Sequence, residues 1–264
     1  MTRDRSLISR KFVELRRKNE AALIVYATAG YPTLPESLRR ISEIGRAGAD
    51  MIEIGVPFSD PVADGPVIQK ASQTAIRGGI TLKKIIAGIR SLAQPTPIIL
   101  MSYLNPILSY GRDIFMRDIS SAGVAGLVVP DLPVEEAALL SRRAISFGID
   151  LIFIVAPTTP ARKINRITRA ARGFIYCASI SGTTGARKTL PPDLAGYIRR
   201  VKQQTGKPLC VGFGISTPGQ VKVLAGFTDG VIVGSRIVEA IRKKEDLKRL
   251  VAAFKKATRR EESC

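Results

Sequence analysis

The feature that most constrains the fold of this chain is a regular alternation between short apolar runs and longer amphipathic segments. Eight runs rich in Ile, Val and Leu recur along the 264 residues. They are predicted as strands: Leu23–Thr28, Met51–Val56, Pro97–Met101, Gly126–Val129, Leu151–Ala156, Phe174–Ala178, Leu209–Gly212 and Val231–Gly234. Continuous apolar runs are typical of parallel strands buried on both faces. Eight such strands alternating with helices predict an α/β fold, a closed (β/α)₈ or TIM barrel.

Between the runs, apolar residues recur at intervals of three and four, the period of a helix with one buried face. The predicted helices are Pro35–Ala47, Leu82–Ala93, Val134–Phe147, Ala161–Ala171, Leu194–Gln204 and Pro218–Leu224. Two further helices are extra to the barrel repeat. Leu7–Lys18 precedes the first strand and is expected to cap the bottom of the barrel, and Val67–Arg77 follows the second strand. No linker divides the chain, so a single domain is predicted over residues 1–264.

The chain is strongly basic, with a net charge of +19. Such an excess raises nucleic acid as a partner. The bases are scattered over several predicted helices, however, with no basic stripe interleaved with aromatic residues and no recognisable nucleic-acid-binding module. We interpret most of them as solvated helix faces, which would also steer an anionic ligand. No apolar run approaches the roughly 20 residues of a membrane span, so we expect a cytoplasmic protein.

The residue types narrow the chemistry, because the chain has no histidine and three cysteines. Cys177 and Cys210 lie in apolar, strand-like runs, which is typical of reduced core thiols. Neither a disulfide framework nor a metal site is expected. Acid–base chemistry must therefore fall to carboxylates, lysine, tyrosine or cysteine. Tyr176, in the sixth predicted strand, fits a core aromatic or a pocket wall better than an acid.

Glu53 lies in the middle of the second predicted strand, where burial of a charged carboxylate is costly. It is either a salt-bridged core glutamate or a carboxyl group with a raised pKa that transfers protons. We favour proton transfer, because histidine is absent. The following loop, residues 55–66, adds Asp60 and Asp64, each of which alone is typical of a turn. Because this loop directly follows the strand of Glu53, one of the aspartates can work with Glu53 in catalysis. Two carboxyl groups in different surroundings can divide the acid and base roles.

Glycine-rich segments follow the sixth, seventh and eighth predicted strands, at Ser181–Gly185, Gly212–Ser216 and Gly234–Arg236. Barrel active sites form at the C-terminal ends of the strands. The backbone amides of these segments, with the N-terminus of a short helix beginning near Ser235, predict a phosphate site. Asn105 and Asp131 also lie at strand ends, where roles in a turn, an interface or a pocket all stay open.

Several of these segments together resemble one family, the tryptophan synthase alpha subunit. Residues 53–66, Glu-Ile-Gly-Val-Pro-Phe-Ser-Asp-Pro-Val-Ala-Asp-Gly-Pro, look like its signature. The resemblance continues at residues 27–32, 101–106, 129–133, 156–159, 181–185, 212–216 and 233–235. It therefore extends from the first to the eighth predicted strand. It implies a lyase of tryptophan biosynthesis that cleaves indole-3-glycerol phosphate, by a retro-aldol reaction, into indole and glyceraldehyde 3-phosphate.

The resemblance also implies roles for individual residues. Glu53 is then the principal acid–base residue, and Asp64 interacts with the indole nitrogen. Substrate-binding residues are implied around the indole ring (Tyr26, Met101, Tyr176 and Phe213), around the phosphate (Gly185, Gly214, Gly234 and Ser235) and on a mobile loop that closes toward Asp64 (Thr184). Three residues are implied to face a beta subunit: Asp60, Asn105 and Asp131.

By the same resemblance, this chain carries no cofactor, and pyridoxal phosphate belongs to the beta subunit. Indole passes to that subunit within an alpha2beta2 heterotetramer. No specific nucleic acid and no membrane is expected as a partner. Two alternatives stay open: a standalone lyase that releases free indole, and, from the charge, a basic nucleic-acid-binding protein. Rate activation by a beta subunit tests the first, and salt-sensitive binding to generic duplex tests the second.

Overall fold

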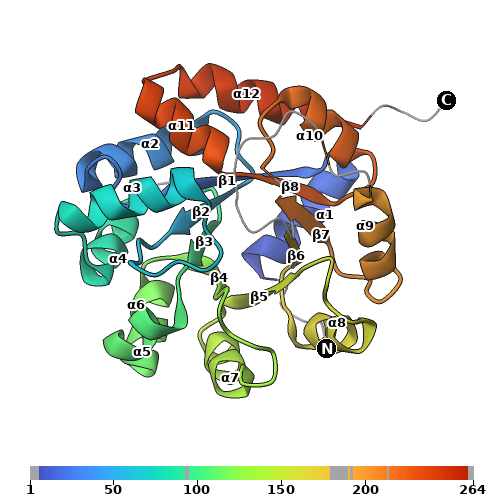
Figure 1. Cartoon of the computed structure of the whole chain (residues 1–264), viewed down its shortest axis with the longest axis horizontal. Helices are drawn as coiled ribbons and strands as arrows, with labels where there is room; N and C mark the ends of the chain where they lie inside the picture. Colours follow the sequence, from blue (N-terminus) through green and yellow to red (C-terminus); the bar gives the residue numbers. More distant parts are fainter. Residues whose placement is uncertain (1–5, 93–94, 179–189, 191–192, 213, 261–264) are drawn as a thin grey trace.

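Eight parallel strands close into one barrel in the order of the sequence, with β8 pairing back to β1 (Figure 1). The computed structural model describes residues 6–92, 95–178, 190, 193–212 and 214–260. The strands are β1 (Ala22–Thr28), β2 (Met51–Gly55), β3 (Ile98–Met101), β4 (Val124–Val128), β5 (Asp150–Val155), β6 (Ile175–Ala178), β7 (Leu209–Gly212) and β8 (Gly230–Val233). All eight predicted strands are confirmed to within two residues at each end, as is the barrel.

Helices surround the barrel and cover the outer faces of its strands (Figure 1). They are α1 (Leu7–Arg17), α2 (Leu34–Arg46), α3 (Pro66–Arg77), α4 (Leu82–Arg90), α5 (Leu104–Tyr110), α6 (Arg112–Ser121), α7 (Ala138–Ser146), α8 (Ala161–Ala170), α9 (Leu194–Lys202), α10 (Pro218–Ala225), α11 (Ser235–Lys243) and α12 (Leu247–Ala257). Both extra helices are confirmed, as α1 and α3. The helix predicted from Val134 begins only at Ala138, because residues 134–137 form a turn.

Three helices were not predicted from the sequence. Between β3 and β4, α5 and α6 are separated by Gly111, whose φ of +89° breaks the helix. In the short α5 only Ile107 is buried, so its apolar period is weak. At the C-terminal end, α12 buries Leu247, Val251 and Phe254 at helical intervals, a pattern that the many lysines and arginines there obscure.

The interior of the barrel is closed at the bottom by α1, as predicted. Ile8, Phe12 and Leu15 of this helix pack against inward-facing residues near the start of the strands. Phe12 meets Phe174 edge to face, with ring centroids 5.9 Å apart. The N-terminal end of the barrel is therefore filled by apolar side chains. The polar side chains lie at the opposite end, where the strands finish.

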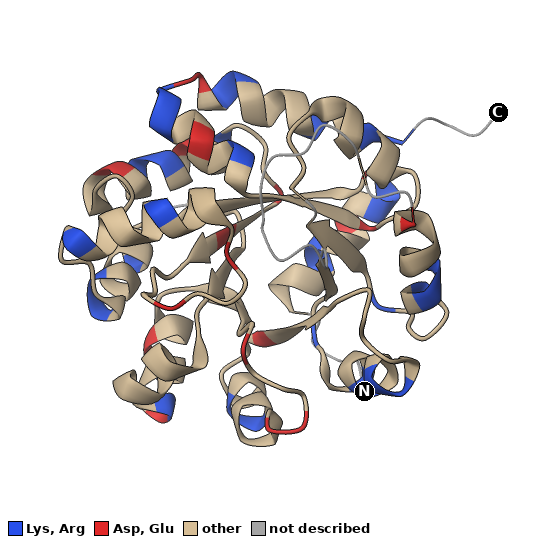
Figure 2. Cartoon of the chain, in the orientation of Figure 1, with Lys and Arg blue, Asp and Glu red and all other residues tan. Residues whose placement is uncertain are grey.

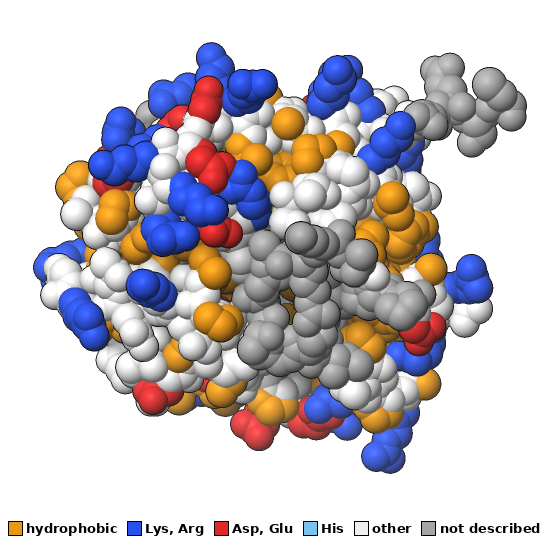
Figure 3. All heavy atoms as spheres, turned by 45° about the horizontal axis from the view of Figure 1, so that its top comes forward, with side chains coloured by type: hydrophobic (Ala, Val, Ile, Leu, Met, Phe, Trp, Pro, Cys, Tyr) orange, Lys and Arg blue, Asp and Glu red, His pale blue; other side chains and the backbone are white. Residues whose placement is uncertain are grey.

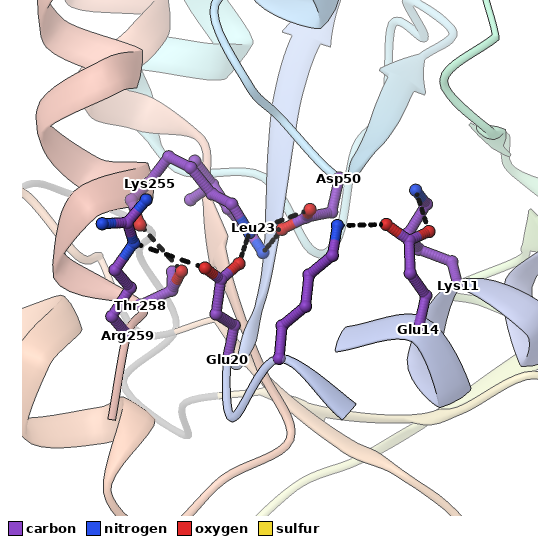
Figure 4. A network of polar contacts seen from close by, with 9 residues as sticks. Lys11, Glu14, Glu20, Leu23, Asp50, Lys255, Thr258 and Arg259 are labelled. Carbon is purple, nitrogen blue, oxygen red and sulfur yellow. Dashed lines mark hydrogen bonds and ion pairs between the residues drawn. The ribbon is translucent and has the colours of Figure 1, made fainter. Parts of the chain in front are cut away.

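A partly buried ionic cluster joins α12 to the start of β1 and β2 (Figure 4). The Lys255 Nζ lies 2.7 Å from Glu20 Oε2 and 2.9 and 2.8 Å from the two carboxylate oxygens of Asp50. The Asp50 carboxylate also accepts a hydrogen bond from the Leu23 N–H at 2.8 Å. Arg259 reaches Glu20 at 3.3 Å. The last helix is therefore fixed to the first strands.

The excess positive charge is spread over the outer helices (Figures 2 and 3). Ten helices of the described chain carry Lys or Arg in their last turn. Cations there are stabilised by the partial negative charge of a helix C-terminus. Because the outer helices run back toward the start of the strands, much of this charge lies toward the bottom of the barrel. The interpretation of the bases as helix-face charge agrees with this distribution.

Candidate active site

Polar side chains face inward at the C-terminal end of β1 and β2. In the register of these strands Tyr26 lies opposite Glu53, and Thr28 lies opposite Gly55. Gly55 in turn lies opposite Met101 at the end of β3. The strand period of two places Tyr26 and Thr28 on the same face, above the apolar layer formed by Ile24 and its neighbours. Sequence positions far apart therefore meet at one end of the barrel.

Glu53 is buried to 2% exposure, and its Oε1 has no hydrogen-bond partner among the described residues. Burial, and secondarily the charge of Asp64, raise its pKa to about 8. The group is thus a neutral carboxylic acid at neutral pH, with a free oxygen directed into a protein interior. A buried polar atom without a partner is costly, so such an atom points to a ligand that completes it.

The two aspartates of the β2–α3 loop occupy different environments. Asp64 is buried to 8% exposure, whereas Asp60 is exposed and lies beside the Ser59 hydroxyl. Burial raises the pKa of Asp64 to about 6, with the Tyr103 hydroxyl acting in the opposite direction. Asp64 therefore remains ionised at neutral pH while Glu53 keeps its proton. The structure places Asp64, and not Asp60, with Glu53.

Aromatic and thioether side chains surround the two carboxyl groups. Tyr26 packs in one cluster with Met101, and Met101 also packs against the interior cluster that includes Tyr176. Two glycines make room for the tyrosines. A Cβ at Gly55 would lie 2.0 Å from the Tyr26 hydroxyl oxygen, and one at Gly212 would lie 2.8 Å from that of Tyr176. The carboxyl groups therefore lie in a largely apolar environment, which is suited to binding a flat aromatic ring.

The predicted phosphate site is partly within the described chain. Gly214 has a φ of +65°, a conformation that favours glycine. Gly234 is the N-cap of α11, and Ser235 is the first residue of that helix. A Cβ added to Gly234 would lie 3.5 Å from the Tyr26 Cβ. The helix α11 therefore begins beside the aromatic side chains that surround the carboxyl groups. Three predicted site residues lie outside the described residues: Thr184, Gly185 and Phe213.

The three residues predicted to face a partner are all exposed, and they follow β2, β3 and β4 in turn: Asp60, Asn105 and Asp131. They therefore share the C-terminal end of the barrel. Asp131 also has a structural role, because its carboxylate accepts hydrogen bonds from the Leu104 N–H at 2.9 and 3.2 Å. It thus caps α5 from the neighbouring loop.

Two residues of the site were missed by the sequence analysis. Thr28 is buried, and it lies one strand period beyond Tyr26 on the same face of β1. Tyr103, 2% exposed, interacts with Asp64. A strand-end threonine is visible in the sequence, but nothing local distinguishes it from a core residue. Neither a cluster of three metal-ligating side chains nor a helix able to span a membrane occurs in the part of the chain that the structure describes.

Comparison with known proteins gives a consistent result. The family described as Tryptophan synthase alpha chain matches residues 12–263. The chain belongs to this family. The alpha chain of Carboxydothermus hydrogenoformans is 47% identical over 238 residues, covering 89% of each chain, and that of Citrifermentans bemidjiense is 46% identical over 240 residues, covering 90% of each. A solved structure of Mycobacterium tuberculosis tryptophan synthase matches with a TM-score of 0.93 at 36% identity, covering 98% of this chain and 100% of that one.

Family membership confirms the resemblance found in the sequence. The chain is therefore a carbon–carbon lyase of tryptophan biosynthesis that acts on indole-3-glycerol phosphate. The alternatives of a standalone lyase and a basic nucleic-acid-binding protein gain no support from the family. In this histidine-free chain, two carboxyl groups with separated pKa values lie together at the C-terminal end of the barrel.

Proposed function

We propose that Glu53 and Asp64 perform the cleavage of indole-3-glycerol phosphate. The observation that carries this assignment is the buried, partnerless Oε1 of Glu53 on a carboxyl group whose pKa is raised to about 8. The neutral acid donates its proton to indole C3, which makes the ring an electron sink. The ionised Asp64 stabilises the positive charge that then develops at the ring nitrogen.

The bond between C3 and the glycerol chain then breaks, and its electron pair returns to the ring to give neutral indole. The Glu53 carboxylate takes the proton of the hydroxyl on the carbon that becomes the aldehyde, which restores the acid form. The products are indole and glyceraldehyde 3-phosphate. The carboxyl pair suffices for both proton transfers, and no cofactor of this chain is needed.

The substrate is held at two further places in this proposal. The indole ring lies between Tyr26, Met101 and Tyr176, and the phosphate lies at the N-terminus of α11, where the helix dipole favours an anion. Gly214, Gly234 and Ser235 would supply close backbone and side-chain contacts there. The family resemblance adds Phe213 to the ring pocket, Gly185 to the phosphate site and Thr184 to a closing loop.

We further propose that the chain acts with a beta subunit that carries pyridoxal phosphate, in an alpha2beta2 heterotetramer. Two observations support a partner at the C-terminal end of the barrel. The similar M. tuberculosis structure is of tryptophan synthase, and Asp60, Asn105 and Asp131 are exposed on adjacent loops. A single domain over residues 1–264 and a cytoplasmic location complete the proposal. The free, buried thiols of Cys177 and Cys210 agree with a reducing compartment.

The test is an indole-release assay with purified protein, run with and without a tryptophan synthase beta subunit. We expect indole and glyceraldehyde 3-phosphate in equal amounts, and a higher rate when the beta subunit is present. Equal rates in both conditions would contradict the partnership. Absence of both products, in a folded preparation with the beta subunit present, would contradict the assignment of the site.

A further inference from the structure

Tyr103 connects the loop that bears Asp64 to the end of β3. It lies two residues after the last residue of that strand and is the N-cap residue of α5. Its hydroxyl oxygen accepts a hydrogen bond from the Ala63 N–H at 3.1 Å, one residue before Asp64. Its ring stacks on Phe58, with centroids 5.0 Å apart and an interplanar angle of 27°. The tyrosine therefore contacts the β2–α3 loop on both sides of residues 59–62.

The same hydroxyl also interacts with the nearby Asp64 carboxylate and lowers the pKa of that group. A phenol can accept one hydrogen bond and donate another, so the two contacts are compatible. Burial raises the pKa of Asp64, and in the described chain Tyr103 is the group that opposes this rise. No Lys or Arg of the described chain shifts the Asp64 pKa, in a protein with 41 of these residues.

Tyr103 is itself held in place from the other side. Asp131, from the loop after β4, accepts the N–H of Leu104, the residue that follows Tyr103. Gln69 of α3 donates its side-chain amide to the Asp64 carbonyl oxygen at 2.8 Å, which fixes the far end of the loop. The Tyr103 hydroxyl thus lies between the start of α5 and the end of the β2–α3 loop, both fixed by hydrogen bonds, and the residue is 2% exposed.

We propose that Tyr103 is a positioning residue for the reaction: its hydroxyl holds the Ala63 N–H and orients the adjacent Asp64 carboxylate, while its ring stacks on Phe58 and holds the loop in place. This inference rests on the role of Asp64 in the proposed function. Tyr103 acts through Asp64 and takes no part in the proton transfers of Glu53. The other ionisable groups that face Asp64 are Glu53 of β2, Tyr26 of β1 and Tyr176 of β6, and Asp131 faces Tyr103.

The test compares Tyr103→Phe with Tyr110→Phe. Both variants lose only a hydroxyl, and the control hydroxyl donates to Asp118 at 2.8 Å, in a pair formed between α5 and α6. Removing the Tyr103 donor should raise the pKa of Asp64, because the ionised form loses its hydrogen bond. We expect kcat/KM of Tyr103→Phe to fall by roughly fivefold at about pH 6 and to approach the parent near pH 8. Tyr110→Phe should match the parent throughout.

A second readout is independent of turnover. The carboxyl carbons of ¹³C-labelled aspartate are titrated by NMR, and the Asp64 signal is identified by its loss in Asp64→Asn. We expect its titration midpoint to be higher in Tyr103→Phe by about one pH unit. An unchanged midpoint, or an activity loss that is uniform across pH and accompanied by a lower melting temperature, would overturn the proposal. A parent enzyme that titrates as expected but does not cleave the substrate would instead contradict the proposed function alone.

Discussion

The carboxyl groups of Glu53 and Asp64 share one buried region of the barrel, and the negative charge of Asp64 helps to hold a proton on Glu53. With pKa values raised to about 8 and about 6, the pair carries one proton over the neutral range. The two values belong to the coupled pair more than to either residue alone. Near neutral pH, Glu53 is thus a proton donor and Asp64 a neighbouring anion, so the site has both groups without a histidine.

The first prediction follows from this shared proton. We expect kcat/KM for cleavage to follow a bell-shaped pH profile, with limbs near pH 6 and pH 8, since Asp64 must be ionised and Glu53 protonated. Initial rates measured from about pH 5 to pH 9 at low substrate concentration would give both limbs. A rate that rises steadily from pH 7 to pH 9 would contradict the acid role of Glu53.

Glu53→Gln should lose activity and gain stability. The amide keeps the shape but cannot exchange a proton, so cleavage should fall by about two to four orders of magnitude. The folded Glu53 keeps its proton up to about pH 8, while in the unfolded chain it ionises near the ordinary glutamate pKa of 4.5. The stability of the parent therefore decreases as the pH rises between these values. At pH 8 the variant should unfold with a free energy higher by at most about 4 kcal/mol.

Denaturant unfolding at pH 5 and pH 8 measures that difference, which should be larger at pH 8. Activity within a few-fold of the parent would mean that Glu53 is structural. A stability difference that does not grow with pH would mean that the carboxyl group is ionised when folded.

Asp64→Asn and Asp60→Asn form a matched pair on one loop. Asp64 is buried beside Glu53 and Asp60 is exposed, so the first variant should lose catalysis severely. The second should keep the intrinsic cleavage rate of the isolated chain and affect only activation by the beta subunit. Steady-state kinetics with and without that subunit separate the two effects. Equal losses in the isolated chain would leave the choice of Asp64 as the ring-nitrogen partner without support.

Gly234→Asp should weaken phosphate binding more than folding. A Cβ there meets the Tyr26 Cβ at 3.5 Å and Ile68 Cδ1 at 3.7 Å, which are ordinary contacts, so the fold should accept a side chain. The added bulk and negative charge at the start of α11 should raise KM strongly. Gly206→Asp is the control, because a Cβ at Gly206 has no atom within 4 Å. Unchanged affinity of Gly234→Asp for glycerol 3-phosphate would refute the phosphate site.

Lys255→Met should be strongly destabilising. It leaves the buried carboxylate of Asp50 and the partly buried one of Glu20 without their shared cation, and loss of one partner from a fully buried pair costs about 3–5 kcal/mol, which is the upper limit for this partly exposed lysine. Its neighbour Lys256 is exposed, so Lys256→Met should stay within about 0.5 kcal/mol of the parent. Urea unfolding of both variants measures the difference. Similar midpoints would show that Lys255 is dispensable.

The parts of the molecule that could be predicted from the sequence are those set by local pattern. The strands follow from apolar runs, and Glu53 stands out because it interrupts one of them. Asp60 and Asp64 are alike locally, each before a turn-forming residue, and only the folded chain separates the buried one from the exposed one. Tyr103 could not be found, since its role depends on Ala63, which is 40 residues away. The short α5 was missed because it buries only Ile107.

One contact between residues far apart in the sequence has a consequence for how the chain is made. Asp50 and Lys255 are 205 residues apart, yet they form one ion cluster at the start of the barrel. Ribosomes add about 5–20 residues per second, so Asp50 waits roughly 10 to 40 s for its cation to be synthesised. During that interval the first strands cannot bury this carboxylate in its final, paired form. The ion cluster can therefore reach its final form only after the last helix has been synthesised, so protein synthesis itself sets the earliest time at which it forms.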